Sequence, residues 1–516
     1  MASQNKGCGC LTVVAGLLIA GAGGAYLYLR GNLPWQQFNF HQASSVIPYN
    51  TLAVTHVTTN QKQWSKLSDL VSPEAQKVIG SSLSIIAQNL PQENLNTIEQ
   101  DILPWVEGIS LAWVDDSRLL VVAGIKDKIK AFQYQKNLGQ KYTIVTTDYR
   151  NVDINQIATQ GNIFYYAILN NYLVIAEEKG TIELAINAQL SNSSYQDRPG
   201  IKALRQELKL KNLLIESYVD NPSDLEPEYR EYLGQIRGFA SGVGLVADGL
   251  HMQTIVKLDP SLVTSQLSSA DRKFLASLPE NTWLLISGHN LKQTWSDLVT
   301  HSENIPELEE FVREVRQGFA TVSLNVDQDV FGWMNQEYAI ALINSDQSTV
   351  SFGIGGLVLF KTSDPQTASN TFAQLSQLAS ENFITVQDRQ IRRETITEWY
   401  QDSELLLSQG WLNKQTLGVT IVTPWEALTT SNQSLVQQES FKKINRYLPQ
   451  KYSQYFYLDM NQLLDIFKNN FGIYAMILPQ EALVVLESID SIAGVNTMSR
   501  DNSSITDIII YMNPHN

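Results

Sequence analysis

The sequence has very few cysteines and more acidic than basic residues. Among its 516 residues only Cys8 and Cys10 are cysteines, and both precede the first long apolar segment. Disulfides therefore cannot stabilise the rest of the chain. The net charge is -15, and no basic stripe with interleaved aromatic residues is present. Because an acidic body repels a phosphate backbone, we expect no nucleic-acid partner.

Catalytic signatures are also missing. The chain contains no G-x-S-x-G turn, no H-E-x-x-H pair and no G-x-x-x-x-G-K-[ST] loop. Asn325, Asp327 and Asp329 resemble the start of a calcium loop, but Gly332 comes two positions late. The glycines of 353–356 fall in a strand-like run, not at a phosphate-binding turn. The six histidines are scattered: His41, His56, His251, His289, His301 and His515. We therefore predict no catalytic, cofactor-binding or metal-ligating residue, no cofactor and no enzymatic activity.

One long uncharged segment is present near the start. The run Leu11–Leu29 is 19 residues long and is bounded by Lys6 and Arg30. At 1.5 Å per residue it nearly matches the roughly 30 Å hydrocarbon core of a bilayer. It predicts a single uncleaved transmembrane anchor in 1–30, with the N-terminus in the cytoplasm and the body exported. A cleaved signal peptide is the alternative, since Ala20-Gly21-Ala22 looks like a cleavage site.

Smaller features surround this segment. Gly16, Ala20 and Gly24 lie four residues apart, a spacing that favours a homodimer through one helix face. Cys8 and Cys10 are interpreted as palmitoylation sites, as a metal pair or as idle thiols, and the sequence leaves these alternatives open. Residues 31–45 are almost uncharged and rich in Asn, Gln, Ser and aromatics, which indicates a short tether.

The remainder of the chain repeats itself. Several landmarks recur in the same order after about 230 to 240 residues, which favours a duplicated domain over chance. They are Pro48 and Pro279, Trp64 and Trp295, Trp105 and Trp333, Asp101 and Asp329, and Tyr218-Val219-Asp220 and Tyr457-Leu458-Asp459. We predict two homologous domains, in residues 46–276 and 277–516. The paired tryptophans are interpreted as core anchors, with ligand stacking as the alternative.

Each copy shows short apolar runs that alternate with helical patterns. The expected strands include 109–114, 119–125, 338–343, 352–360, 250–258 and 505–512, and the expected helices include 128–138 and 365–379, the latter capped by Ser363 or Asp364. Most neighbouring strands are joined as hairpins. The expected fold class is therefore α+β: one N-terminal transmembrane helix followed by two homologous domains of mostly antiparallel sheet with packed helices.

Four motifs give the chain a family resemblance: Val46-Ile47-Pro48, Trp64-Ser65-Lys66-Leu67, Ser72-Pro73-Glu74-Ala75-Gln76, and Asp101 through Gly108 to Leu111-Ala112. In these the sequence resembles a family of cyanobacterial membrane-anchored proteins classified only as a domain of unknown function. The resemblance implies the plasma or thylakoid membrane, with the body on the periplasmic or lumenal side. It implies no activity and no site residue.

Three functions remain open at this point. The first is a membrane-anchored extracytoplasmic binding or scaffold protein, with the membrane and a membrane protein complex as partners. The second is a lipid or pigment carrier with an apolar cavity in each copy, which a large apolar pocket lined by the shared tryptophans would favour. The third is an enzyme with an unrecognised site, which clustered titratable groups in a cleft would favour.

Overall fold

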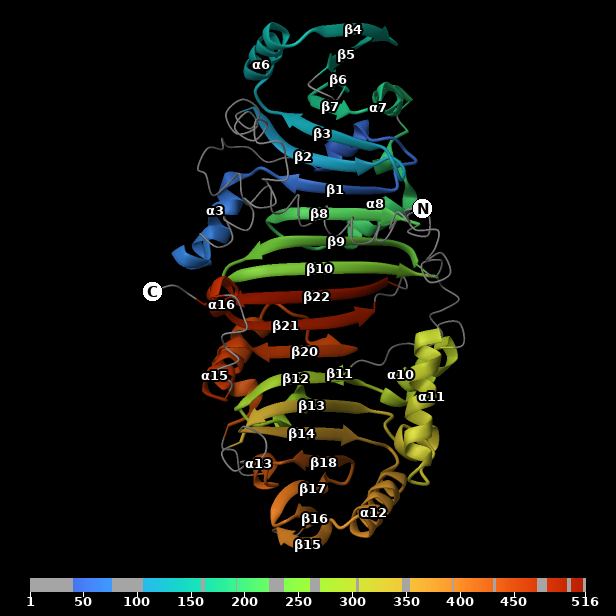
Figure 1. The fold of residues 1–516 in the computed structure, drawn as a ribbon, viewed down its shortest axis with the longest axis vertical. Coiled ribbons are helices and arrows are strands. Elements are labelled where there is room, and N and C mark those ends of the chain that lie inside the picture. Colours follow the sequence, from blue (N-terminus) through green and yellow to red (C-terminus); the bar gives the residue numbers. More distant parts are fainter. Residues whose placement is uncertain are drawn as a thin grey trace, which may run out of the picture.

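The computed structural model describes residues 40–76, 105–158, 163–191, 193–221, 236–259, 270–302, 306–345, 353–391, 394–429, 433–470, 480–498 and 503–513. These residues form one sheet of twenty strands, whose described pairings are all antiparallel, and a separate two-stranded pairing of β11 (Ala270–Asp271) with β19 (Lys451–Tyr452). The strands are stacked along the long axis of the molecule (Figure 1).

The strands of the large sheet fall into two halves. The first half comprises β1 (Ala53–Thr58), β2 (Val106–Trp113), β3 (Leu119–Ile125), β4 (Ile144–Tyr149), β5 (Val152–Ala158), β6 (Ile163–Leu169), β7 (Tyr172–Ala176), β8 (Leu213–Asp220), β9 (Ile236–Val246) and β10 (Gly249–Leu258). The second comprises β12 (Thr282–His289), β13 (Glu337–Asn344), β14 (Ile354–Lys361), β15 (Thr385–Ile391), β16 (Glu394–Gln401), β17 (Glu404–Asn413), β18 (Thr416–Ile421), β20 (Gln454–Asp459), β21 (Ile489–Met498) and β22 (Ser503–Met512).

The spatial order of the strands is the same in the two halves. In the first it runs β4-β5-β6-β7-β3-β2-β1-β8-β9-β10. In the second it runs β15-β16-β17-β18-β14-β13-β12-β20-β21-β22. The last strands of the two halves, β10 and β22, pair with each other and join the halves into one sheet.

This junction corrects the expected fold class. We expected two domains, each with its own sheet, and the structure instead has one large antiparallel sheet. The physical reason is that the final strand of each half has an unpaired edge, and an exposed edge is a template for pairing with another strand. A sequence repeat predicts the strands of each half but not how their edges meet.

The expected membrane anchor is not part of the described structure. Residues 11–29, positions 31–39 of the tether predicted at 31–45, and the small-residue positions Gly16, Ala20 and Gly24 lie outside the described residues, as do Cys8 and Cys10. The last part of that tether, residues 40–45, lies in helix α2 (Phe40–Ala43) and the 3-10 turn η1 (Ser44–Val46), where Ala43 is buried. Within the described ranges, no helix combines the length and the apolar character needed to cross a membrane.

Helices close one face of the sheet, which we call the covered face. In the first half this layer consists of α2 (Phe40–Ala43), the 3-10 turn η1 (Ser44–Val46), α7 (Lys179–Ser191) and α8 (Pro199–Glu207). Their side chains pack on Val54, Ala112 and Val122, which alternate with outward-facing residues along β1, β2 and β3. In the second half η7 (Arg272–Ser277), η9 (Leu435–Gln437) and α14 (Glu439–Asn445) cover Leu285, Ala341 and the strands beside them in the same way.

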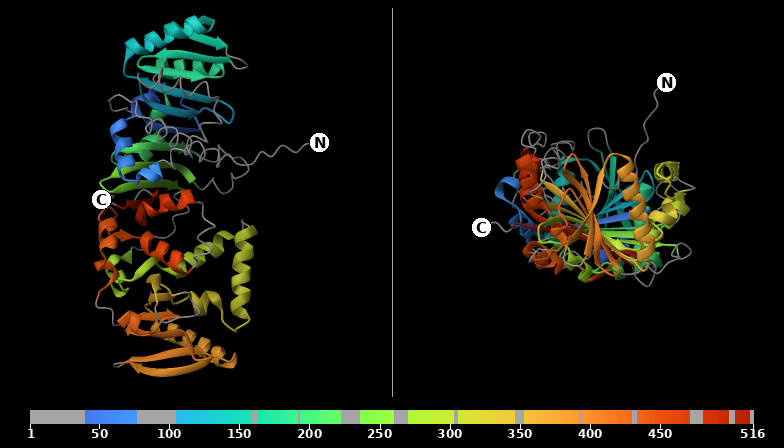
Figure 2. Two further views of the ribbon diagram at one scale, coloured as in Figure 1. Left: turned by 60° about the vertical axis from the view of Figure 1, so that its left-hand side comes forward. Right: turned by 90° about the horizontal axis from the view of Figure 1, so that it is seen from below.

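Besides the short elements η3 (Tyr195–Asp197), η8 (Val326–Val330) and α13 (Glu426–Thr429), the remaining helices flank the opposite face, which we call the open face. They are α3 (Gln61–Asp69), α6 (Lys128–Lys141), α10 (Leu291–Ser302), α11 (Pro306–Ala320), α12 (Pro365–Glu381), α15 (Met460–Asn470) and α16 (Gln480–Glu487). Helices α10 and α11 stand on one side of the sheet, and α15 and α16 stand on the other (Figure 2). The open face is therefore bordered by helices along the strand ends.

Most individual elements lie close to where the sequence predicts them. The strand expected at 119–125 is β3, and the helix expected at 365–379 is α12, which extends to Glu381. Asp364 is its N-cap, because its side chain accepts a hydrogen bond from the backbone N–H of Thr367. The repeated landmark Asp459 has a structural role: Gln438 Nε2 donates to its Oδ2 at 2.9 Å. Asp220 is bound in the same way by Arg198 Nε, also at 2.9 Å.

Candidate functional site

The repeated tryptophans are core residues, and none of them is among the residues that line the pocket described below. All four are buried: Trp64, Trp105, Trp295 and Trp333. Trp64 Nε1 donates to the carbonyl of Thr58 at 2.7 Å, and Trp295 stacks on Phe331 with ring centroids 4.7 Å apart. These contacts favour core anchoring over ligand stacking.

The acidic stretch that resembles a calcium loop serves as a cap. Asn325 Oδ1 accepts hydrogen bonds from the backbone N–H groups of Asp327 and Gln328, and Asp329 Oδ2 accepts from the N–H of Asn325. Asp327 Oδ1 also accepts from Trp295 Nε1 at 2.6 Å. Across the described part of the chain, no group of three or more His, Cys, Asp or Glu side chains is arranged to hold a metal ion.

Buried titratable groups are found on the covered face of the first half. His56 in β1 lies directly opposite Glu216 in β8. Burial lowers the pKa of His56 to about 3, and its ring nitrogens contact Ser110 Oγ at 2.7 Å and Ser44 Oγ at 3.2 Å. Burial also raises the pKa of Glu216 to about 7, while the Tyr218 hydroxyl donates to its Oε2 at 2.9 Å. The group is enclosed by core residues, so it has no described access for a substrate.

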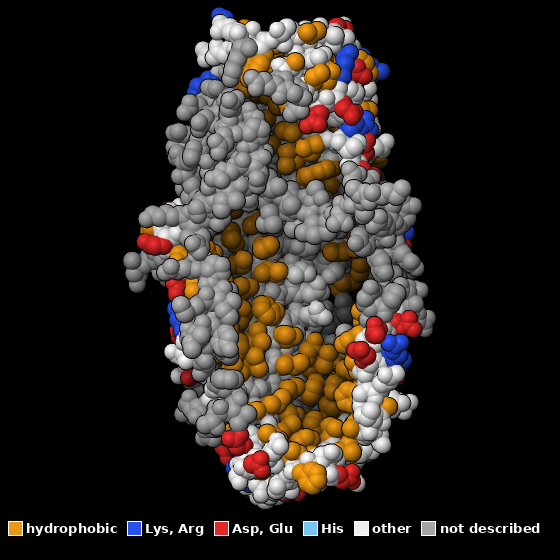
Figure 3. All heavy atoms as spheres, viewed as in Figure 1, with side chains coloured by type: hydrophobic (Ala, Val, Ile, Leu, Met, Phe, Trp, Pro, Cys, Tyr) orange, Lys and Arg blue, Asp and Glu red, His pale blue; other side chains and the backbone are white. Residues whose placement is uncertain are grey.

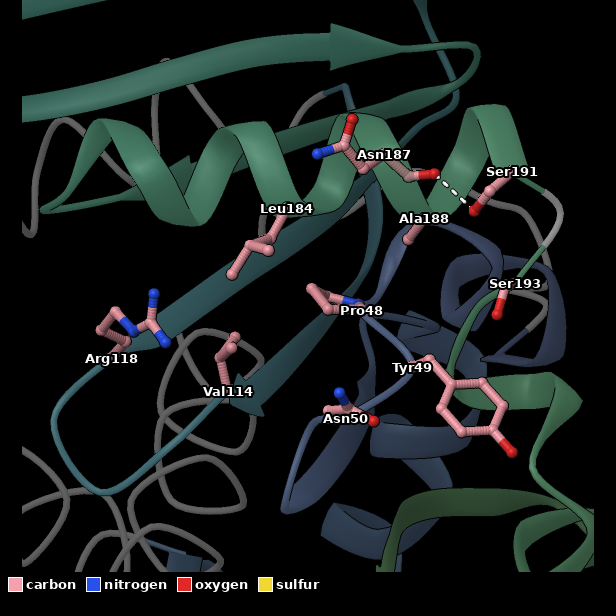
Figure 4. Close-up of a pocket in the computed structure, with 10 residues that line it drawn as sticks. All are labelled: Pro48, Tyr49, Asn50, Val114, Arg118, Leu184, Asn187, Ala188, Ser191 and Ser193. Atoms are coloured by element: carbon pink, nitrogen blue, oxygen red, sulfur yellow. Dashed lines mark hydrogen bonds between the residues drawn. The ribbon is translucent and has the colours of Figure 1, made fainter.

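One pocket of about 340 Å³ opens beside α7 (Figure 4). It is lined by Pro48, Tyr49, Asn50, Val114, Arg118, Leu184, Asn187, Ala188, Ser191 and Ser193. Its cation is already engaged, because Arg118 Nε donates to Asp115 Oδ2 at 2.6 Å, and this bond lowers the pKa of Asp115 to about 2. The pocket therefore offers no unused charge with which to select a ligand.

The open face carries a line of apolar side chains that extends over nine strands. Strand register places one side chain per strand in a line that crosses β14, β13, β12, β20, β21, β22, β10, β9 and β8 in that order. We call this line row one, and it consists of Val358, Ile340, Ile286, Phe456, Gly494, Ile508, Met252, Val243 and Ile215. Every position is apolar or glycine.

A second line runs beside the first, two residues further along each strand. Row two consists of Gly356, Leu342, Leu284, Leu458, Ile492, Ile510 and Leu250. All of its side chains from Leu342 to Leu250 are partly exposed. We call the two rows together the apolar strip, and neither row contains a charged or polar side chain.

Solvent reaches the strip most in the second half. Ile286 is 46% exposed and Ile340 is 42% exposed, although both lie in the middle of sheet strands. Figure 3 shows hydrophobic side chains along the middle of this face, most continuous over the lower strands of the view, where the surface is hollowed. A contiguous exposed apolar surface of this kind marks a binding site on a folded protein.

A polar line borders the strip on its other side. It consists of Thr55, Ser217, Ser241, Thr254, Thr506, Asn496 and Gln454. Neighbours along it are bonded to each other, with Thr55 and Ser217 hydroxyls 2.9 Å apart and Ser241 and Thr254 hydroxyls 3.1 Å apart. The strip thus has an uncharged polar margin.

Sequence interpretation missed the strip, although a signal for it is present. Runs such as Leu357-Val358-Leu359-Phe360 and Ile508-Ile509-Ile510 are continuously apolar, whereas a strand with one wet face alternates apolar and polar residues. Continuous runs indicate that both faces of these strands are apolar. The strands were expected, but the second apolar face was not considered.

Comparison with known proteins identifies a family without a function. The family model described as "Protein of unknown function (DUF3352)" matches residues 11–512. No curated protein matches the chain. Among solved structures, crystal form III of TP0453 matches with a TM-score of 0.26 and 6% identity, covering 42% of this chain and 80% of that one. Crystal form IV of TP0453 gives a TM-score of 0.24 and 8% identity over 42% and 81% of the two chains. TM-scores this low do not support a shared fold or a shared function.

Proposed function

The chain belongs to the DUF3352 family of proteins of unknown function, and we propose that it binds the hydrocarbon chains of membrane lipids along the apolar strip. The observation that carries the proposal is the unbroken apolar character of row one from Val358 to Ile215. Covering the strip with an acyl chain removes its apolar surface from water, which is favourable by about 25 cal/mol per Å² of protein surface buried.

The dimensions of the strip suit lipid chains. Neighbouring strands lie about 4.8 Å apart, so the nine strands of row one span roughly 40 Å. The hydrocarbon core of a bilayer, which holds two chains end to end, is roughly 30 Å thick. Row two doubles the width of the apolar surface without adding a polar group.

A protein partner fits this surface less well. Protein interfaces carry about ten direct hydrogen bonds and a polar rim around their apolar centre. The strip offers no side-chain donor or acceptor over the strands of the second half from β20 to β14. The helices along the strand ends leave a trough more suited to a flexible chain than to a flat protein surface. Helix α16 forms part of this border, since Val484 and Val485 pack beside Ile510 of row two.

The proposal also gives the anchor a role. A chain held on a membrane by residues 11–29 would have its lipid ligand close at hand, on the periplasmic or lumenal side that the sequence predicts. We further infer that the two halves of the sheet arose by duplication, which their shared strand order supports. We therefore expect the protein to bind lipid without chemical turnover. If lipid labelling fails, a scaffold for a membrane protein complex becomes the favoured function.

Photo-crosslinking tests the proposal on the full-length chain. The protein is reconstituted into phosphatidylcholine vesicles that contain a trace of phospholipid with a diazirine on its acyl chain, and labelled peptides are identified by mass spectrometry. We expect label in peptides from β12, β13 and β20. In the double variant Ile286→Glu/Ile340→Glu the amount of label in these peptides should fall about tenfold, because a bound acyl chain would bury unpaired carboxylates.

The control variant changes an equally exposed apolar residue elsewhere. Leu190 in α7 is 51% exposed and belongs to the helix layer of the covered face. Leu190→Glu should therefore label as the natural chain does. Absence of label from all open-face peptides, or equal loss in both variants, would contradict lipid binding and favour the scaffold.

A further inference from the structure

The strip crosses the junction of the two halves, where β10 pairs with β22. On the open face Met252 of β10 lies opposite Ile508 of β22, and Leu250 lies opposite Ile510. All four side chains are partly exposed. We call these two pairs the seam.

The charged and titratable groups of the junction are on the covered face, and beside the strip the open face carries the hydroxyl side chains of Thr254 and Thr506, which lie opposite each other. Gln253 lies opposite Asp507, and Gln253 Nε2 donates to Asp507 Oδ1 at 2.7 Å. His251 Nε2 is also 2.7 Å from that oxygen. Because successive residues of a strand point to opposite faces, this bonded group is separated from the seam by the sheet itself. The junction therefore places no charge in the path along the strip.

No charged or polar side chain of row one separates the halves on either side of the seam. Row one reaches the seam from the second half through Phe456 and Gly494, and leaves it through Val243 and Ile215. Gly494 is buried, and Ile508 Cγ1 would lie 3.3 Å from a Cβ built on it, so apolar neighbours fill the space above its backbone. Two separate lipid stations would need an interruption at this point, and the described residues provide none.

We propose that the strip is one continuous path shared by both halves of the sheet. Phospholipid acyl chains pass along it across the seam, and the strip holds more than one acyl chain at a time. This inference rests on the proposed function. Its basis is length: a path of roughly 40 Å exceeds what a single chain from one leaflet of a bilayer occupies, which is about half of a roughly 30 Å core.

The path has a more open end and a more closed end. The most exposed positions of row one, Ile286 and Ile340, lie in β12 and β13 of the second half. Beyond Ile215 the next position is Val57, which is buried against Trp64 of α3. Chains would therefore enter over the second half and cross the seam towards β9 and β8.

The same diazirine-labelled phospholipid, in vesicles that carry the full-length protein, tests the passage. In the natural chain we expect crosslinks in β12 and β13, in β10 and β22, which contain the seam, and in β8 and β9. The variant Met252→Glu/Ile508→Glu places two carboxylates in the path. It should keep the crosslinks in β12 and β13 and lose those in β8 and β9 by about fivefold, because an unpaired buried charge opposes an apolar chain.

Three results would overturn the inference, and they are distinguishable. Crosslinks in β12 and β13 without any at the seam of the natural chain would show a single station in the second half, with lipid binding intact. Unchanged labelling of β8 and β9 in Met252→Glu/Ile508→Glu would show that the halves load independently. No crosslink on the open face at all would remove the proposed function itself. Leu190→Glu serves as the folded control, and the natural chain alone decides the first and third results.

Discussion

The two halves of the sheet share a strand order but present different side chains at matching positions. Thr55 lies seven residues after Pro48 and Ile286 lies seven residues after Pro279, and each proline forms the same kind of isolated bridge to a serine. Thr55 is 1% exposed, whereas Ile286 is 46% exposed. The second half thus keeps an apolar open surface where the first half keeps a closed, hydroxyl-bearing one.

The covered faces differ in the same sense, because the titratable side chains are again in the first half. His56 and Glu216 in the first half are replaced at the matching strand positions by Ser287 and Tyr455 in the second. Ser287 Oγ donates to the carbonyl of Tyr338, and the Tyr455 hydroxyl donates to Asn445 Oδ1. The comparison teaches that the backbone framework tolerates either chemistry. The asymmetry is therefore a property of the side chains and not of the fold.

The largest expected effect is a loss of stability from removing a repeated tryptophan, and it should be equal in the two halves. Trp64→Ala and Trp295→Ala should each lower the free energy of unfolding by about 3–5 kcal/mol, because each empties a large buried aromatic site. Denaturant unfolding measures the loss. A large loss in one half with almost none in the other would break the structural equivalence of the halves.

The next effect belongs to the first half alone. The pKa of Glu216 is raised to about 7 by burial, whereas its ordinary value is 4.5. The folded state therefore binds more protons at this group than the unfolded state between these values, so the contribution of Glu216 to stability falls by about 3 kcal/mol as pH rises from 4.5 to 7. Because His56 contributes in the opposite direction above pH 5, the effect is read from the difference between the natural chain and Glu216→Gln in denaturant unfolding at several pH values. Tyr455→Phe, at the matching position, should leave it in place.

A third effect has the opposite sign with pH. Burial lowers the pKa of His56 to about 3, so the folded state binds fewer protons than the unfolded state below pH 6.5. The contribution of His56 to stability should fall by about 2 kcal/mol as pH decreases from 6.5 to 5, while that of Glu216 rises over the same range, so the two nearly cancel in the natural chain. His56→Gln should remove the His56 contribution and become more stable by about 2 kcal/mol from pH 6.5 to 5, which thermal unfolding across the range measures. A variant whose stability does not change over this range would mean that another group titrates there.

The smallest effect concerns the polar margin. Thr254→Val removes the hydroxyl that bonds Ser241 at 3.1 Å, and should cost about 1 kcal/mol, the usual net value of such a bond. The matching position in the second half is Ile508, so the apolar replacement has a precedent within the molecule. Chemical unfolding checks the value. A loss above about 3 kcal/mol would show that the row is a structural network and not a margin.

Sequence patterns predicted the local elements well and the assembly poorly. Leu119–Ile125 and the Asp364-capped helix were predictable because strand and cap signals are local. The pairing of β10 with β22 was not, since it depends on two edges about 250 residues apart in the chain. The strip needs the register of nine strands, so residues such as Ile286 and Met252 are individually ordinary and become a site only when the pairing aligns them.

Native mass spectrometry of the full-length protein tests lipid binding on the strip most directly. We expect species heavier than the chain by two or more phospholipid masses after release from detergent. Ile286→Glu/Ile340→Glu should lose these species, and Leu190→Glu should keep them. A natural chain that appears only at its own mass, after exposure to phospholipid vesicles, would contradict lipid binding on the strip.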